Sequence, residues 1–93
     1  MVLMYTTRFC PFCVRARQLL QRKQVDFEEI AVDGDPGRRE EMRLRSGRHT
    51  VPQIWIGGRH VGGCDELREL ERRGELDAML VAAATGEFDN NEE

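Results

Sequence analysis

Short apolar runs, separated by polar and glycine-containing breaks, recur along most of the chain. The run Val2–Thr6 predicts a buried β-strand near the N-terminus. Apolar residues that alternate with polar ones predict a second strand over residues 25–32, with one slip in phase, and Gln53–Ile56 predicts a third. Gly57-Gly58 is a two-residue hairpin signal, so residues 59–61 are expected to return as an antiparallel strand.

Other segments show the spacing of three to four residues between apolar positions that is typical of amphipathic helices. Two of them begin at Pro11 and Pro36, because proline lacks the N–H that the first helical turn leaves unpaired. Asp35 is the expected N-cap of the second helix. A third helix is expected from Asp65 onward, and Gly74 separates it from a last one.

The expected order is βαβα followed by ββαα, which defines an α/β fold. A βαβ unit makes parallel strands through a right-handed crossover, whereas the glycine hairpin makes antiparallel ones. We therefore expect a small mixed four-stranded sheet flanked by helices on both faces. The 93 residues suffice for one domain, placed at residues 1–84, and we expect the acidic segment 85–93 to be a disordered tail.

Composition and charge exclude several classes of function. Hydrophobic residues are 40% and charged residues 33%, which is the balance of an ordinary globular protein. The net charge of -3 argues against nucleic acid as a partner. No apolar run approaches the ~18 residues of a membrane span, and no basic segment precedes the apolar start as in a secretory signal. These features predict a cytoplasmic protein that binds neither nucleic acid nor a membrane.

Arginine is concentrated between residues 38 and 48, where Glu40 and Glu41 interrupt it. This mixture is typical of a solvated helix face. The alternative is that one of these arginines binds a small anionic ligand.

The chain has three cysteines, two of which form a Cys10-x-x-Cys13 pair. Disulfide-stapled secreted domains usually have more cysteines, in even number. Cys10 falls where the first strand ends and the first helix begins, and a helix N-terminus favours the reactive thiolate. Arg8 adds positive charge nearby. Cys13 lies almost one helical turn later, so Cys10 can attack a disulfide and Cys13 can resolve the mixed disulfide that results.

The same pair is also half of many zinc sites, but such a site needs two further ligands. Cys64, His49 and His60 are available, and none of them forms a second closely spaced pair. Ligation of an iron–sulfur cluster within one chain is disfavoured for the same reason, and a cluster shared between two chains is disfavoured somewhat less. We therefore predict no metal site.

Three segments, at residues 5–13, 50–56 and 62–67, resemble the glutaredoxin family in sequence, order and spacing. The resemblance extends over about residues 2–80 and is strongest to bacterial dithiol glutaredoxins. It implies a thioredoxin-like fold and a monomer that reduces protein disulfides and glutathione mixed disulfides. Glutathione would be the reducing cosubstrate, regenerated by glutathione reductase, with no tightly bound cofactor.

The resemblance also implies a glutathione site. Pro52 matches the cis-proline of the family, and a cis bond leaves the backbone of Val51 free to pair with a bound substrate, beside Thr50. The amides of Cys64 and Asp65 at a helix start can hold the γ-glutamyl carboxylate, while the Asp65 side chain meets the ammonium group. Cys64 itself is expected to contribute backbone contacts rather than redox chemistry, with oxidation of its thiol as a side possibility.

Three further positions are assigned to the site with departures or alternatives. Arg39 matches the residue that reaches the glycine carboxylate of glutathione, although a solvated helix face explains it almost equally well. Phe12 stands where tyrosine is commoner and retains the apolar wall. Thr7 stands where many members have lysine, so Arg8 would have to supply the positive charge.

Two rival functions remain at this point. The first is a protein of the same kind that thioredoxin reductase reduces, which the Gly-Gly-Cys-Asp sequence of residues 62–65 argues against. The second is a dimer that holds a [2Fe–2S] cluster through Cys10 and glutathione. Cluster carriers of the family usually have a single active-site cysteine followed by glycine, whereas this chain has Pro11 and Cys13.

Overall fold

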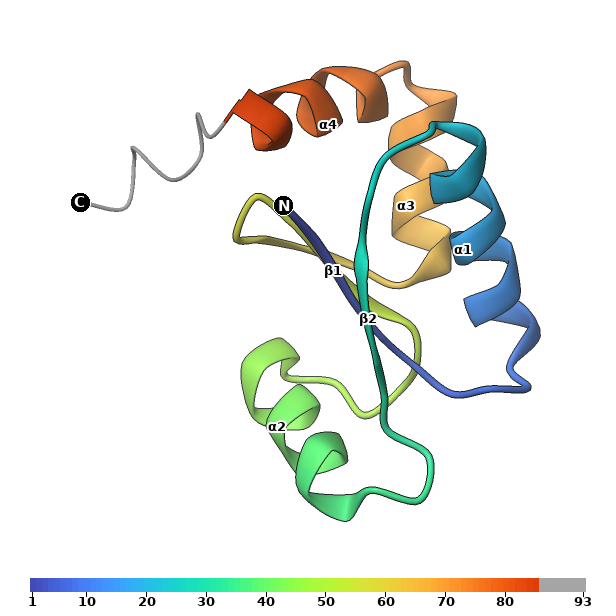
Figure 1. The fold of residues 1–93 in the computed structure, drawn as a ribbon, viewed down its shortest axis with the longest axis vertical. Helices are drawn as coiled ribbons and strands as arrows, with labels where there is room; N and C mark the ends of the chain where they lie inside the picture. Colours follow the sequence, from blue (N-terminus) through green and yellow to red (C-terminus); the bar gives the residue numbers. More distant parts are fainter. Residues whose placement is uncertain (86–93) are drawn as a thin grey trace.

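The computed structural model describes residues 1–85, in which four strands form one mixed sheet (Figure 1). The strands are β1 (Val2–Thr6), β2 (Glu28–Ala31), β3 (Gln53–Ile56) and β4 (Arg59–Gly62), in the spatial order β2-β1-β3-β4. β1 is parallel to β2, whereas β3 is antiparallel to both β1 and β4. The expected α/β fold of the thioredoxin-like kind is confirmed.

Helices cover both faces of this sheet, with one on one side and three on the other (Figure 1). The helices are α1 (Pro11–Arg22), α2 (Pro36–Ser46), α3 (Cys64–Arg72) and α4 (Leu76–Thr85). Successive side chains of a strand point to opposite faces. Met4 accordingly packs in the core formed with α1, α3 and α4, while Tyr5 packs with Met42 of α2 on the opposite face. No helix within residues 1–85 is long and apolar enough to cross a membrane.

Two boundaries differ from the sequence-based expectation. β2 begins at Glu28 rather than at residue 25, because it is an edge strand that pairs with β1 only from Glu28 to Ala31. Val25 and Phe27 still pack against the core from outside the strand. α3 begins at Cys64, one residue early, since Gly63 is its N-cap.

The last described element also differs slightly from the expected domain boundary. Thr85 belongs to α4, and its hydroxyl donates a hydrogen bond to the Ala82 carbonyl at 3.0 Å, which closes the last turn. The rest of the predicted acidic tail lies outside the described residues.

The topology brings two loops together at one edge of the sheet. β1 ends at Thr6, just before the loop that contains Cys10, and Tyr5 is paired with Gln53 at the start of β3. The loop before β3 therefore lies beside the loop after β1. The loop before β3 contains Thr50, Val51 and Pro52.

Candidate active site

Cys10 is the N-cap residue of α1. It has extended backbone angles, with φ at -82° and ψ at 121°, and Pro11 follows as the first helical residue. Helical hydrogen bonding begins at once, because the Val14 N–H donates to the Cys10 carbonyl at 3.0 Å. The first turn has no acidic residue, and within residues 1–85 no side chain caps it. The unpaired N–H groups of this helix N-terminus can therefore stabilise a negative charge on the Cys10 sulfur.

The loop before β3 lies directly against this cysteine. The Cys10 Sγ donates to the Val51 carbonyl at 3.9 Å, and the Val51–Pro52 peptide bond is cis, as predicted. Gln53 holds the loop, since its Nε2 donates to the Thr50 carbonyl at 3.0 Å and to the Thr50 hydroxyl at 3.2 Å. The structure therefore brings together Cys10 and the three loop residues that the sequence predicted.

The two cysteines of the pair differ in exposure. Cys10 is partly exposed, whereas Cys13 is fully buried. The pKa of the Cys13 thiol is raised to about 11, mainly by burial; the Thr7 backbone N–H lowers it, and the neighbouring Cys10 adds to the rise. An accessible thiol with a protonated one behind it is the arrangement that disulfide exchange needs.

The start of α3 forms the other wall of the site. Cys64 is only 4% exposed, and burial raises the pKa of its thiol. A Cβ added at Gly63 would lie 3.2 Å from the Pro52 carbonyl oxygen, so this turn packs against the cis-proline loop. Gly62 has a φ of +120°, and a Cβ there would approach the Glu66 carboxylate to 2.8 Å. The backbone at Gly62 therefore favours glycine, and a side chain at Gly63 would force the Pro52 carbonyl to shift by a few tenths of an ångström.

Asp65 is exposed in the first turn of α3. The neighbouring residue Glu66 caps the N-terminus of α3, because the Gly63 N–H donates to the Glu66 carboxylate at 2.7 Å. Hydrogen bonding from this N–H is the main reason why the pKa of Glu66 is lowered.

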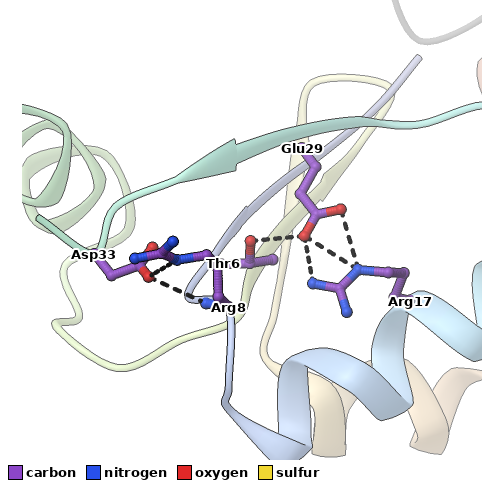
Figure 2. A network of polar contacts seen from close by, with 5 residues as sticks. All are labelled: Thr6, Arg8, Arg17, Glu29 and Asp33. Atoms are coloured by element: carbon purple, nitrogen blue, oxygen red, sulfur yellow. Dashed lines mark hydrogen bonds and ion pairs between the residues drawn. The ribbon is translucent and has the colours of Figure 1, made fainter. Parts of the chain in front are cut away.

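The two predicted arginines have other partners in the structure. Arg8 forms an ion pair with Asp33 at 2.9 Å, and this hydrogen bond lowers the pKa of the Asp33 carboxyl (Figure 2). The Arg39 guanidinium donates to the His49 carbonyl at 3.4 Å. The charge that Arg8 was expected to give to Cys10 is therefore shared with Asp33. Phe12 is half-exposed beside the reactive pair, and the Arg15 guanidinium lies 5.5 Å from its ring centroid.

A polar network near Cys13 was not predicted. Arg17 binds Glu29 with a shortest distance of 2.5 Å, and the Thr6 hydroxyl donates to the same carboxylate at 2.8 Å (Figure 2). The positive charge of Arg17 lowers the pKa of Cys13, against the larger effect of burial. The signal in the sequence was a cation four residues after Cys13, which is the spacing of neighbours on a helix.

The arginine-rich segment of α2 mostly follows the solvated-face interpretation. Arg38 pairs with Glu41 at 3.1 Å and Arg43 pairs with Glu40 at 2.6 Å. Arg45 instead covers aromatic residues. Its guanidinium lies 4.9 Å from the Trp55 ring centroid.

Comparison with known proteins agrees with this geometry. The glutaredoxin family model matches residues 2–61. A glutaredoxin of Pseudomonas aeruginosa is 63% identical over 81 residues, which are 87% of this chain and 96% of that protein. Glutaredoxin 3 of Escherichia coli K12 is 54% identical over 76 residues, which are 82% of this chain and 92% of that protein.

Solved structures of glutaredoxins are also similar to this chain. The solution structure of glutaredoxin from Brucella melitensis has a TM-score of 0.76 at 53% identity, and covers 85% of this chain and 86% of its own. The crystal structure of a buckwheat glutaredoxin–glutathione complex has a TM-score of 0.83 at 28% identity, and covers 89% of this chain and 78% of its own.

The chain belongs to the glutaredoxin family. It is a glutaredoxin of the bacterial type, an oxidoreductase that acts on thiols and disulfides. Within residues 1–85, no group of three or more His, Cys, Asp and Glu residues could hold a metal ion.

Proposed function

We propose that this protein uses glutathione to reduce protein disulfides and glutathione mixed disulfides, with Cys10 as the nucleophile and Cys13 as the resolving thiol. The difference in exposure between the two cysteines carries this proposal. Cys10 is partly exposed at the N-terminus of α1, whereas Cys13 is fully buried.

The reaction sequence follows from these positions. The Cys10 thiolate attacks one sulfur of the substrate disulfide, the substrate S–S bond breaks, and the other sulfur leaves as a thiolate. Cys13, once deprotonated, attacks the Cys10 sulfur and releases the second substrate thiolate. A glutathione thiolate then opens the Cys10–Cys13 disulfide to leave glutathionyl-Cys10. A second glutathione restores the Cys10 thiolate and departs as oxidised glutathione.

The proposed glutathione site lies between the cis-proline loop and the start of α3. The cysteine part of glutathione would pair with the Val51 backbone, and its γ-glutamyl carboxylate would accept from the Cys64 and Asp65 amides. The Asp65 side chain would meet the ammonium group. The close approach of Gly63 to the Pro52 carbonyl supports this placement, because it makes the two walls adjacent.

Three residues complete the proposed site at its edges. Phe12 would supply an apolar wall beside Cys10, and Thr50 would border the Val51 backbone. Arg39 would bind the glycine carboxylate by exchanging its hydrogen bond to His49 for one to the ligand. Arg8 would contribute long-range attraction only, since it is paired with Asp33.

We propose the cytoplasm as the compartment, because a dithiol reduced by glutathione operates under a reducing poise. Glutathione reductase would act indirectly by regenerating glutathione, and disulfide-containing or glutathionylated proteins would be the partners. A monomeric state stays a prediction.

The test is a coupled assay with NADPH, glutathione reductase and glutathione on a small glutathione mixed disulfide. Cys10→Ser should lose all activity. Cys13→Ser should keep this activity, because glutathione can replace the second thiol, but should lose the reduction of protein disulfides. Substantial activity of Cys10→Ser would contradict the assignment of the nucleophile.

Two further measurements test the rival functions. Equal turnover with thioredoxin reductase as the only reductant would contradict glutathione as the electron source. A visible absorbance band in freshly purified protein would favour the shared iron–sulfur cluster.

A further inference from the structure

Most arginine side chains within residues 1–85 have an acidic or other polar partner, and most of those without one lie in one place. Within residues 1–85, four arginine side chains form no hydrogen bond or ion pair: those of Arg15, Arg22, Arg59 and Arg68. Three of these four line a single groove, together with Gln18 and Leu19. Three positive charges along this groove therefore have no ion-pair partner within residues 1–85.

We call this feature the α1–α3 groove, and its shape indicates an elongated ligand. It has a volume of about 480 Å³ and lies between two helices that pack side by side (Figure 1). Arg15, Gln18 and Arg22 follow one side of α1 at intervals of three and four residues, and Arg68 faces them from α3. Seven residues of helix correspond to about 10 Å, which is the length of roughly three extended residues. A single small anion would not reach from one end to the other.

The α1–α3 groove starts beside the reactive pair. The Arg15 guanidinium lies 5.5 Å from the ring centroid of Phe12, which is between Cys10 and Cys13 in sequence. A chain whose disulfide is attacked at Cys10 can therefore extend along α1 into the groove.

Three acidic residues, Asp65, Glu69 and Glu71, border an adjoining hollow that Arg68 also lines. Glu71 is paired with Lys23 at 2.8 Å. Glu69 is neutralised by Arg72, with a shortest distance of 2.5 Å. Asp65 is exposed and is the group proposed above for the ammonium of glutathione. None of these three acidic residues forms an ion pair with Arg15, Arg22 or Arg68.

We propose that the α1–α3 groove binds an acidic, extended segment of protein substrates next to their reactive disulfide. This inference rests on the proposed function and adds the substrate class to it. Individual exposed ion pairs are weak, but several together select partners by charge and accelerate association. The preference should therefore appear in kcat/KM and should weaken as salt screens the charges.

The experiment uses short cysteine peptides, each joined to glutathione by a mixed disulfide. An acidic peptide has four consecutive glutamates next to the cysteine, and a neutral peptide has four glutamines instead. Both peptides are made with these four residues either before or after the cysteine. We expect the protein to prefer the acidic peptide by about tenfold at low salt, and by much less at 0.5 M salt, for one of the two placements. The triple variant Arg15→Gln/Arg22→Gln/Arg68→Gln should lose this preference.

A matched variant, Arg38→Gln/Arg43→Gln/Arg73→Gln, removes the same charge from arginines that are paired elsewhere, and it should keep the preference. Equal turnover of acidic and neutral peptides by the unaltered protein would overturn the proposal. So would an unchanged preference in the groove variant. Activity on a mixed disulfide of glutathione with a small non-peptidic thiol is measured alongside. It should be the same in all three proteins, and its absence in the unaltered protein would refute the proposed function instead.

Discussion

Two helices of this protein have a cysteine at their N-terminus, and the two cysteines differ in exposure and in how the helix end around them is capped. Cys10 is the N-cap of α1 and is partly exposed, whereas Cys64 is the first residue of α3 and is 4% exposed. The first turn of α1 has no acidic residue. In α3, Glu66 already accepts from the Gly63 N–H.

The comparison shows that a helix N-terminus alone does not make a cysteine reactive. Burial raises the pKa of Cys64, and the protein uses part of the α3 terminus for its own cap. The α1 terminus stays accessible at the sulfur itself. This difference supports the proposal that the start of α1 carries the covalent chemistry and the start of α3 holds glutathione by its backbone.

The largest expected effect concerns the pH dependence of Cys13. In the free thiol pair its pKa is raised to about 11, mainly by burial, and this burial remains when Cys10 is in a mixed disulfide. Well below the pKa, the reactive thiolate is a small fraction that grows about tenfold per pH unit. The step in which Cys13 releases a protein substrate from Cys10 should therefore accelerate about a hundredfold from pH 6 to pH 8. Single-turnover kinetics with a preformed mixed disulfide measures this step. A plateau below pH 8 would show that burial does not suppress ionisation of Cys13.

A smaller effect is expected for the ligand-holding start. Asp65→Ala should weaken the use of glutathione by roughly five- to a hundredfold in kcat/KM, because a charge-assisted hydrogen bond contributes about 1–3 kcal/mol. Reaction with a small non-peptidic dithiol should change little. Arg39→Ala should have a smaller effect, since its exposed side chain already has the His49 carbonyl as a partner. Equal losses with both reductants in Asp65→Ala would indicate structural damage instead.

The smallest effect concerns the cap of α3. Glu66→Ala should reduce the free energy of unfolding by about 1 kcal/mol, because the Gly63 N–H loses its acceptor. The matched change Glu69→Ala breaks an exposed pair with Arg72 and should reduce the free energy of unfolding by clearly less, because solvent screens that pair. Urea unfolding of both variants gives the comparison. If the two variants were equally stable, the cap would not distinguish α3 from α1.

Local signals in the sequence predicted most of the fold. Pro11 and Pro36 begin helices as expected, and Asp35 caps α2 by accepting from the Arg38 N–H at 3.0 Å. The hairpin at residues 57–58 also forms, with β4 returning beside β3. These features depend on neighbours in sequence, so they can be recognised without the tertiary structure.

The site was predicted less completely, because some of its contacts join distant parts of the chain. Arg8 and Asp33 are 25 positions apart, and nothing local indicates that they form an ion pair. Arg17 belongs to the polar face of its helix by periodicity, yet it binds Glu29 on β2. The edge position of β2, which shortens the strand, is likewise a property of the assembled sheet.

The central claim is that Cys10, and not Cys64, is the thiol that exchanges with glutathione. It is tested most directly by treating the Cys13→Ser variant with one equivalent of oxidised glutathione and locating the adduct by peptide mass spectrometry. The account predicts a single glutathionyl group on Cys10, with Cys64 unmodified. A glutathionyl group on Cys64, in an amount equal to or greater than that on Cys10, would contradict it.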